Sequence, residues 1–187
     1  EAFDMYKQDF RFCPMATRLS TLVSESPSGR KSGRGTTFAA WWYWTKDGSF
    51  LSASYGINPI SWYAGQNRPE HMFAWWYVVD VAGVASIPVL GDSANSFVSI
   101  GPADEGPPAQ EDAFQDAPPG LAIWTCINRH NETVNYLFLD WSVRKVGLKE
   151  LWTLKWAPAF NTGGKWTRAG GVRAADWPQW MRRFKDY

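Results

Sequence analysis

The run of residues 126–156, CINRHNETVNYLFLDWSVRKVGLKELWTLKW, constrains the fold more than any other part of this sequence. An apolar stretch at 121–128 leads into a polar turn at 129–133 and then a long apolar stretch at 134–144. Two apolar stretches joined by a short polar turn are typical of a β-hairpin. We therefore predict that the two stretches pair antiparallel. One face of the second strand should point into a core, through either Val134, Tyr136 and Phe138 or Leu137 and Leu139.

The rest of the 187-residue chain predicts one domain, spanning residues 1–187. Further strands are expected at 50–57 and 86–90, and a short helix after residue 147 that ends before Pro158. The Gly- and Ser-rich stretch 24–36 is expected to be an exposed loop. Together with a helical reading of residues 1–12, this pattern predicts an α+β fold. An N-terminal helix, or its remnant, would pack on an antiparallel β-sheet with long irregular loops.

Thirteen tryptophans are the anomaly in the composition. Tryptophan combines a large apolar ring with one polar N–H, so it favours cores, subunit interfaces and sugar-stacking platforms. The aromatic clusters at 41–44 and 75–77 suit a carbohydrate platform only in part, because neighbouring strand residues point to opposite faces. The aromatic C-terminal tail is expected to be buried, partly by another chain. Its expected interface residues are Trp177, Trp180 and Phe184.

Charge and motifs argue against several classes of function. The net charge of +1 gives no electrostatic reason to bind nucleic acid or a membrane surface. No sequence motif of a hydrolase, metalloprotease or nucleotide-binding loop is present, so we expect a protein that is not an enzyme. His130, Asp140 and Ser142 lack an evident oxyanion site, which favours a structural role over a catalytic triad. We expect no metal site, and metal binding by Asp92, His130 and Asp140 is the weaker alternative.

A family resemblance rests on the same run of residues. His130 is followed after nine residues by Asp140, within the context NYLFLDWSV at 135–143, where Trp141 replaces the usual glycine. This resembles the His…Asp-Gly domain of bacterial prepilin-type processing-associated proteins, which are kin to type IV pilins and type II secretion pseudopilins. Further matching segments follow in the family's order. They are FCP at 12–14, SYGIN at 54–58, PVLGD at 88–92, and the two closing runs 146–156 and 177–187, which resemble a Trp-rich planctomycete-type subgroup.

The resemblance implies a non-catalytic structural subunit, exported to the cell surface, the extracellular space or the periplasm. Its partners would be copies of itself in a filament or pseudopilus, or other pilin-like subunits. Such proteins carry an N-terminal apolar helix of about 20 residues. No run of that length occurs here, so we expect a globular head domain, with membrane contact only through a helix missing from this sequence.

Export also bears on the two cysteines and on cofactors. In an oxidising compartment, Cys13 and Cys126 are expected to form a disulfide. Pseudopilins often have a calcium loop, and the stretch 101–120 is rich in acids and prolines. Its spacing does not match a known calcium loop, so we expect no cofactor and keep calcium as the alternative. An extracellular carbohydrate-binding module that uses tryptophan platforms remains the alternative to the structural role.

Overall fold

The computed structural model describes residues 12–25, 29, 31–44, 48–58, 82–101, 105–112 and 121–187. Within these residues the chain is mostly β, with two sheets, one short α-helix and a few 3₁₀ turns. The expected α+β class, with a helix packed on a sheet, is therefore wrong. Residues 1–11, where that helix was expected, lie outside the described part. No helix among the described residues has the length and apolar character needed to cross a membrane.

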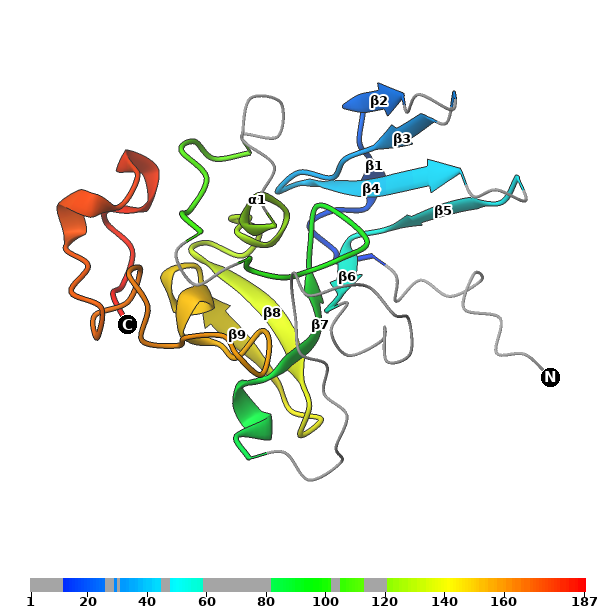
Figure 1. The fold of residues 1–187 in the computed structure, drawn as a ribbon. Helices are drawn as coiled ribbons and strands as arrows, with labels where there is room; N and C mark the ends of the chain where they lie inside the picture. The colour runs from blue at the N-terminus through cyan, green and yellow to red at the C-terminus, as the bar shows by residue number, and fades with distance from the viewer. Residues whose placement is uncertain are drawn as a thin grey trace.

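The first sheet is built around the aromatic strand β4 (Ala39–Trp44). It runs in the order β1-β4-β3-β2, and a fifth strand also pairs with β4. Only β1 is parallel to β4; the other pairings are antiparallel. The partners are β1 (Arg18–Leu19), β2 (Val23–Glu25), β3 (Lys31–Gly33) and β5 (Phe50–Ala53). Figure 1 shows β2 to β5 as a layer that projects away from the rest of the molecule.

Strands β2 and β3 correct the expectation of an exposed loop at 24–36. Their polar residues pair with each other, and β3 pairs in turn with the aromatic β4. The sequence of β3, KSG, carries almost no strand propensity, so its strand conformation comes from its neighbours. Gly33 lies opposite Trp42, whose indole covers the position where a side chain at Gly33 would stand.

The second sheet is fully antiparallel, in the order β6-β7-β8-β9. Its strands are β6 (Tyr55–Ile57), β7 (Pro88–Asp92), β8 (Thr133–Phe138) and β9 (Val143–Gly147). Along β8 the burial alternates, and Val134, Tyr136 and Phe138 are the buried residues. The first of the two predicted core faces is therefore confirmed. The expected strands at 50–57 and 86–90 also exist, although the former breaks at Ser54 and the latter begins at Pro88.

The first strand of the predicted hairpin does not form. The stretch 121–128 contains a helical turn, α1 (Ala122–Thr125), instead of a strand. The turn predicted at 129–133 exists, with Asn131 and Glu132 at positive φ. Strand β8 then pairs on one side with β7 and on the other with β9, the strand that follows it. A short apolar run without clear alternation fits a buried helical turn as well as a strand, which explains the error.

Asp140, Trp141 and Ser142 form the turn between β8 and β9. The N–H of Trp141 donates to the carbonyl of Phe138 (2.9 Å), and Asp140 Oδ1 accepts the N–H of Ser142 (3.0 Å). Trp141 has φ 66°, a left-handed conformation that favours glycine. Its side chain is 81% exposed. Tryptophan thus occupies a turn position whose backbone conformation favours glycine.

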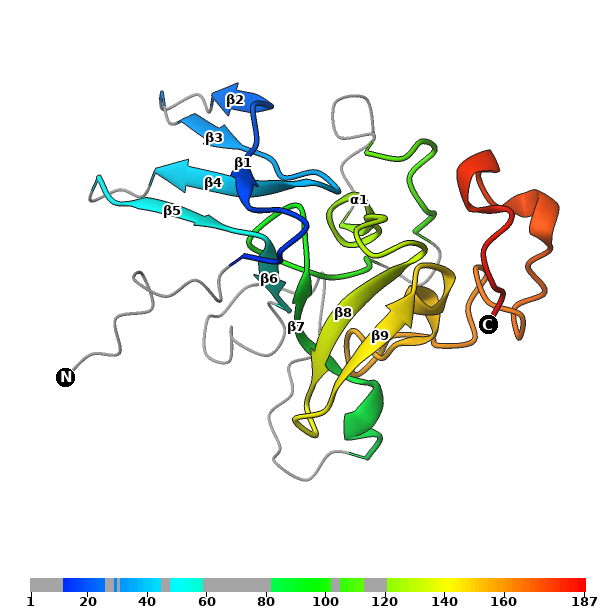
Figure 2. The same cartoon turned by 180° about the vertical axis from the view of Figure 1, so that it is seen from behind.

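The core lies between the second sheet and the C-terminal part of the chain (Figures 1 and 2). The 3₁₀ helix η5 (Lys149–Thr153) follows β9 and buries Leu151 and Trp152, where a short helix was predicted. The tail returns over this segment. The buried Lys149 ammonium pairs with Asp186 (2.7 Å), and Trp152 meets Trp177 edge to face at 5.4 Å.

Candidate functional site

Three potential metal-ligand side chains from distant parts of the sequence meet where the two sheets join. Cys13 precedes β1, Asp92 ends β7, and His130 lies in the turn before β8. His130 Nε2 lies 3.1 Å from Asp92 Oδ2 and 3.3 Å from Cys13 Sγ. Cys13 and Asp92 are fully buried, whereas the His130 side chain is 18% exposed. Solvent therefore reaches this cluster at the imidazole.

Arg129 is the buried cation beside this cluster. Its Nη1 lies 3.2 Å from Asp92 Oδ1, and both side chains are completely buried. The guanidinium also donates to the backbone carbonyls of Thr36, Thr37, Ser54 and Ser93. The first two carbonyls precede β4, and Ser54 separates β5 from β6. Arg129 therefore links both sheets through one planar group that uses most of its donors.

The Asp92 carboxylate is fixed from two sides. Its Oδ1 accepts from Arg129, and its Oδ2 accepts the backbone N–H of Asn135 at 2.7 Å. Asn135 belongs to β8, so the carboxylate is held by the same strand that carries the core face. A buried charge is tolerated where it is paired and hydrogen-bonded in this way. Asp92 Oδ2 also contacts Nε2 of His130.

Burial raises the pKa of the Cys13 thiol, and the charge of Asp92 adds to that effect while Arg129 opposes it. Burial likewise raises the pKa of Tyr55, whose hydroxyl contacts Cys13, to about 12. At neutral pH the thiol is therefore protonated and a weak nucleophile. A Cys-His-Asp triad also needs the thiol and the carboxylate on different imidazole nitrogens, whereas here both face Nε2. The geometry does not match nucleophilic catalysis.

The structure separates Asp140 from the other two residues of the weak metal prediction. His130 precedes β8 and Asp140 follows it, so the two lie at opposite ends of that strand. The Asp140 carboxylate is exposed and accepts the Ser142 hydroxyl at 2.6 Å, which lowers the Asp140 pKa. Asp140 and Ser142 therefore stabilise a turn. Neither the set Asp92–His130–Asp140 nor the triad of His130, Asp140 and Ser142 is assembled.

The predicted disulfide is not formed. Cys13 and Cys126 are both buried free thiols. Cys13 Sγ contacts His130, whereas Cys126 Sγ lies 4.0 Å from the sulfur of Met181 in the core. Two cysteines in one chain suggested a bridge, but each sulfur has a different environment.

The tail residues named as an interface are core residues of their own chain. Trp177 and Phe184 are buried, and Trp180 is partly buried against the same cluster. Trp180 Nε1 also donates to the carbonyl of Pro108 at 3.0 Å. The acid-rich stretch is partly described, and two of its carboxylates bind backbone. Glu105 accepts from Gly101 and Ala122, and Asp112 from Thr37.

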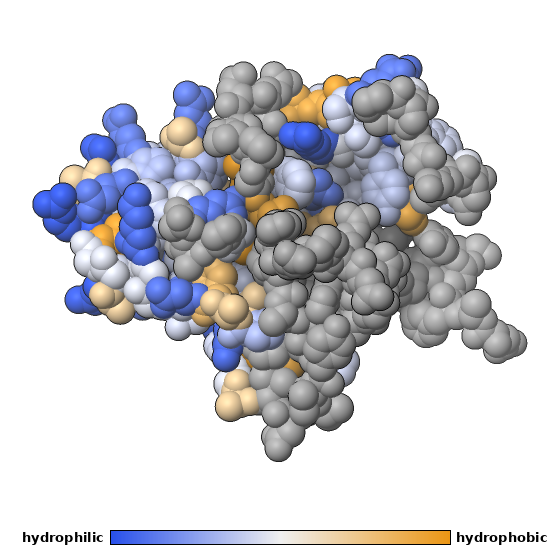
Figure 3. All heavy atoms as spheres, viewed as in Figure 1, coloured by the Kyte–Doolittle hydropathy of each residue, from blue (hydrophilic) through white to orange (hydrophobic). Residues whose placement is uncertain are grey.

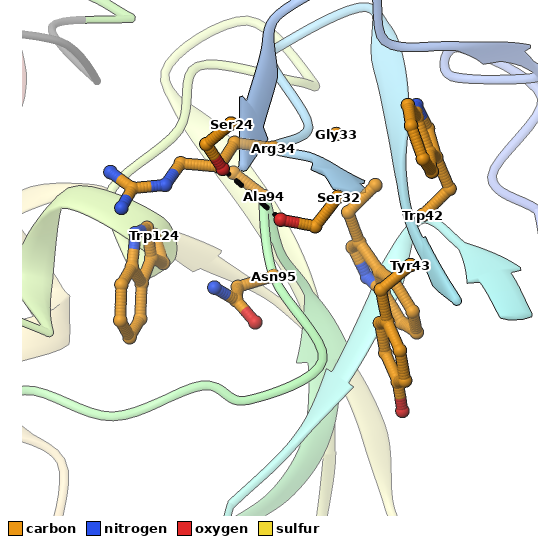
Figure 4. A pocket seen from close by; sticks show the side chains of 10 residues that line it. Ser24, Ser32, Gly33, Arg34, Trp42, Tyr43, Ala94, Asn95 and Trp124 are labelled. Carbon is orange, nitrogen blue, oxygen red and sulfur yellow. Dashed lines mark hydrogen bonds between the residues drawn. The ribbon is translucent and has the colours of Figure 1, made fainter. Parts of the chain in front are cut away.

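A pocket of about 350 Å³ opens on the first sheet. Figure 4 shows Ser24, Ser32 and Asn95 between Trp124 on one side and the aromatic residues of β4 on the other. The rings of Trp41 and Tyr43 stack at 5.6 Å, as expected for alternate residues on one strand face. The cluster at 75–77, also considered for a platform, lies outside the described residues.

Sequence reasoning named Asp92 and His130 as candidate ligands, but it missed their partner Cys13 and the role of Arg129. Nothing in the sequence marks Arg129 as buried, because an arginine in a polar turn is ordinarily exposed. Comparison with known proteins does not settle the family: no family model, curated protein or solved structure matches the chain.

Proposed function

We propose that this protein is a non-catalytic structural subunit that associates with copies of itself. The observation that carries the proposal is the first sheet, where large apolar side chains lie exposed instead of forming a core. The resemblance around His130 and Asp140 favours an exported assembly of the pilin or pseudopilin type, at the cell surface or in the periplasm. Other pilin-like subunits are then the natural further partners.

The exposed apolar residues concentrate in and around strands β1 to β5. Phe38, just before β4, is 61% exposed. Trp44 and Phe50 are a cross-strand pair of β4 and β5, with rings 5.1 Å apart and both exposed. Met15, Leu19 and Val23 complete the set. An apolar surface of this extent is typical of a contact with another protein. Figure 3, by contrast, shows hydrophilic side chains over the C-terminal segment.

An open sheet edge adds a second means of association. Strand β2 is exposed along its length, and among the described strands it pairs only with β3. Such an edge leaves backbone N–H and C=O groups that a strand of another chain can pair with. Copies of this chain carry the same edge, so antiparallel pairing of two β2 strands gives a symmetric contact.

The test compares two pairs of exposed apolar residues by sedimentation over a range of concentrations. The double variant Trp44→Ser/Phe50→Ser should weaken self-association, while its melting temperature stays close to that of the parent. The matched control is Trp141→Ser/Val143→Ser, which removes two still more exposed apolar residues at the β8–β9 turn and the start of β9. A parent that stays monomeric at high concentration contradicts the proposal, as does an equal effect of both double variants.

The pocket on the first sheet favours carbohydrate binding as a second candidate. It combines stacked aromatic rings with hydroxyl and amide groups, as sugar sites require. Titration with oligosaccharides should change the tryptophan fluorescence, and Tyr43→Ala should abolish that change. Trp44→Ala is the matched control, because Trp44 is the next residue of β4 and does not line the pocket. Absence of saturable binding to a broad oligosaccharide panel removes this candidate.

A further inference from the structure

We propose that Cys13, Asp92 and His130 bind a divalent transition metal, for which zinc fits best. Their ligand atoms Sγ, Oδ2 and Nε2 all lie within 4.8 Å of one another. Thiolate, imidazole and carboxylate are the three side-chain ligands that zinc takes in proteins. The site is independent of the exposed sheet surface, so it stands apart from the assembly proposed above.

Two of the three separations between ligand atoms lie close to those of tetrahedral coordination. With zinc–sulfur bonds of about 2.3 Å and zinc–nitrogen or zinc–oxygen bonds of about 2.0–2.2 Å, neighbouring ligand atoms lie roughly 3.3–3.6 Å apart. Here the separations are 3.3 Å from Cys13 Sγ to His130 Nε2 and 3.1 Å from that nitrogen to Asp92 Oδ2. The third separation, between Cys13 Sγ and the Asp92 carboxylate, is at most 4.8 Å.

His130 Nε2 lies near both of the other ligand atoms. A neutral imidazole has one proton, so Nε2 either donates a proton or accepts one. If it accepts from the Cys13 thiol, its lone pair faces the Asp92 carboxylate at 3.1 Å, an arrangement that a cation between the two groups would stabilise. If it donates to Asp92, the sulfur keeps its hydrogen bonds with Tyr55 and the Met15 backbone.

Residues around the three ligands hold them in position with hydrogen bonds. Arg129 and the backbone N–H of Asn135 orient the Asp92 carboxylate, and the Tyr55 hydroxyl contacts the Cys13 sulfur. Such outer contacts fix ligand geometry in zinc sites. Because a thiolate and an imidazole take part, the site should prefer zinc or cobalt to calcium or magnesium. The exposed side of His130 leaves room for water as the fourth ligand.

The test uses the full chain, freed of metal with a chelator under reducing conditions and titrated with Co²⁺. One equivalent should give the visible bands of tetrahedral cobalt and a thiolate-to-cobalt charge-transfer absorption. Zn²⁺ should displace the cobalt and raise the melting temperature. Cys13→Ser should lose the charge-transfer band, and His130→Gln should weaken zinc binding at least about tenfold. Cys126→Ser, which removes the other buried thiol, should behave like the parent.

A second measurement covers the case in which a variant fails to fold. In the parent protein, Zn²⁺ should slow alkylation of Cys13 and leave Cys126 unaffected, as located by peptide mass spectrometry. The proposal is overturned if the parent binds no stoichiometric Co²⁺, if Cys13→Ser keeps the charge-transfer band, or if zinc does not protect Cys13.

Discussion

The two sheets differ in how far they bury some of their aromatic residues. In the second sheet and the segment packed on it, Trp152, Trp156 and Trp177 are almost completely buried. In the first sheet, Trp44 and Phe50 pair with each other and stay exposed. The second sheet buries its aromatic residues because η5 and the C-terminal tail pack against it. An excess of tryptophan therefore predicts large apolar surfaces, but whether these form a core or a contact surface depends on the chain around them.

The junction between the sheets should give the largest effect. Arg129→Met takes the permanently charged partner from the buried Asp92 carboxylate, which keeps His130 and the N–H of Asn135, and it removes donors from the carbonyls of Thr36, Thr37 and Ser54. Loss of one partner of a buried ion pair costs about 3–5 kcal/mol, and unsatisfied carbonyls add to that. We expect a loss of about 5 kcal/mol or more in the free energy of unfolding, measured by urea denaturation. Arg183→Met, at an exposed arginine 3.7 Å from Glu132, should change it by less than about 1 kcal/mol.

Two tryptophan variants test whether the aromatic residues of the two sheets contribute differently to stability. Trp156→Ala opens a cavity in the buried cluster and should cost about 3–5 kcal/mol. Trp44→Ala removes an exposed ring and should cost less than about 1 kcal/mol. Both values come from chemical denaturation monitored by circular dichroism. Similar losses for the two variants are incompatible with different roles of aromatic residues in the two sheets.

Two glycines provide a finer test, because each lies opposite an aromatic residue of the neighbouring strand. Gly91 pairs with Tyr136 and Gly33 pairs with Trp42, and in both places an added Cβ would overlap with the ring. Tyr136 is buried and cannot move, so Gly91→Ala should cost about 1–3 kcal/mol. Trp42 is only partly buried, so Gly33→Ala should cost less. Equal costs from thermal melts of both variants would show that the first sheet is packed as firmly as the second.

The smallest expected effect concerns an exposed aromatic residue of the second sheet. Trp141 stands at φ 66°, where a residue with a Cβ is strained by about 1–2 kcal/mol. Trp141→Gly relieves this strain at some cost in chain entropy, so stability should rise by about 1 kcal/mol. Trp141→Ala keeps the strain and serves as the control in the same denaturation experiment. A destabilised glycine variant would mean that the indole contributes more to the fold than its exposure indicates.

Local patterns were predictable from the sequence, and the pairing between distant segments was not. The alternation along β8 limited its buried face to one of two sets, of which the structure buries Val134, Tyr136 and Phe138, since side chains of a strand alternate between faces. The polar strands β2 and β3 had no such pattern, because their partners hold them extended. The N-terminal helix was expected from the family resemblance and from residues 1–12, of which only Phe12 belongs to the described part of the chain.

In the candidate site, too, residue types were predictable from the sequence, but contacts between distant segments were not. Asp92 and His130 were recognisable as ligand types, but Asp140 was added because it is near His130 in the sequence. A strand that separates two residues also carries them apart, by about 3.3 Å per residue. Cys13 joins the site from the other end of the chain, through contacts between β1 and β4 that no local signal specifies. The burial of Arg129 depends on three separate segments, at 36–37, 54 and 92–93, so it could not be predicted from the sequence either.

The position of Arg129 in the chain also sets the order in which the protein can mature. The carbonyls that it binds, at residues 36, 37, 54 and 93, are all synthesised before it. Until residue 129 leaves the ribosome, no guanidinium is present to anchor the first sheet. Incompletely folded chains with exposed apolar side chains are prone to aggregation. We therefore expect the chain to aggregate most readily before Arg129 has emerged.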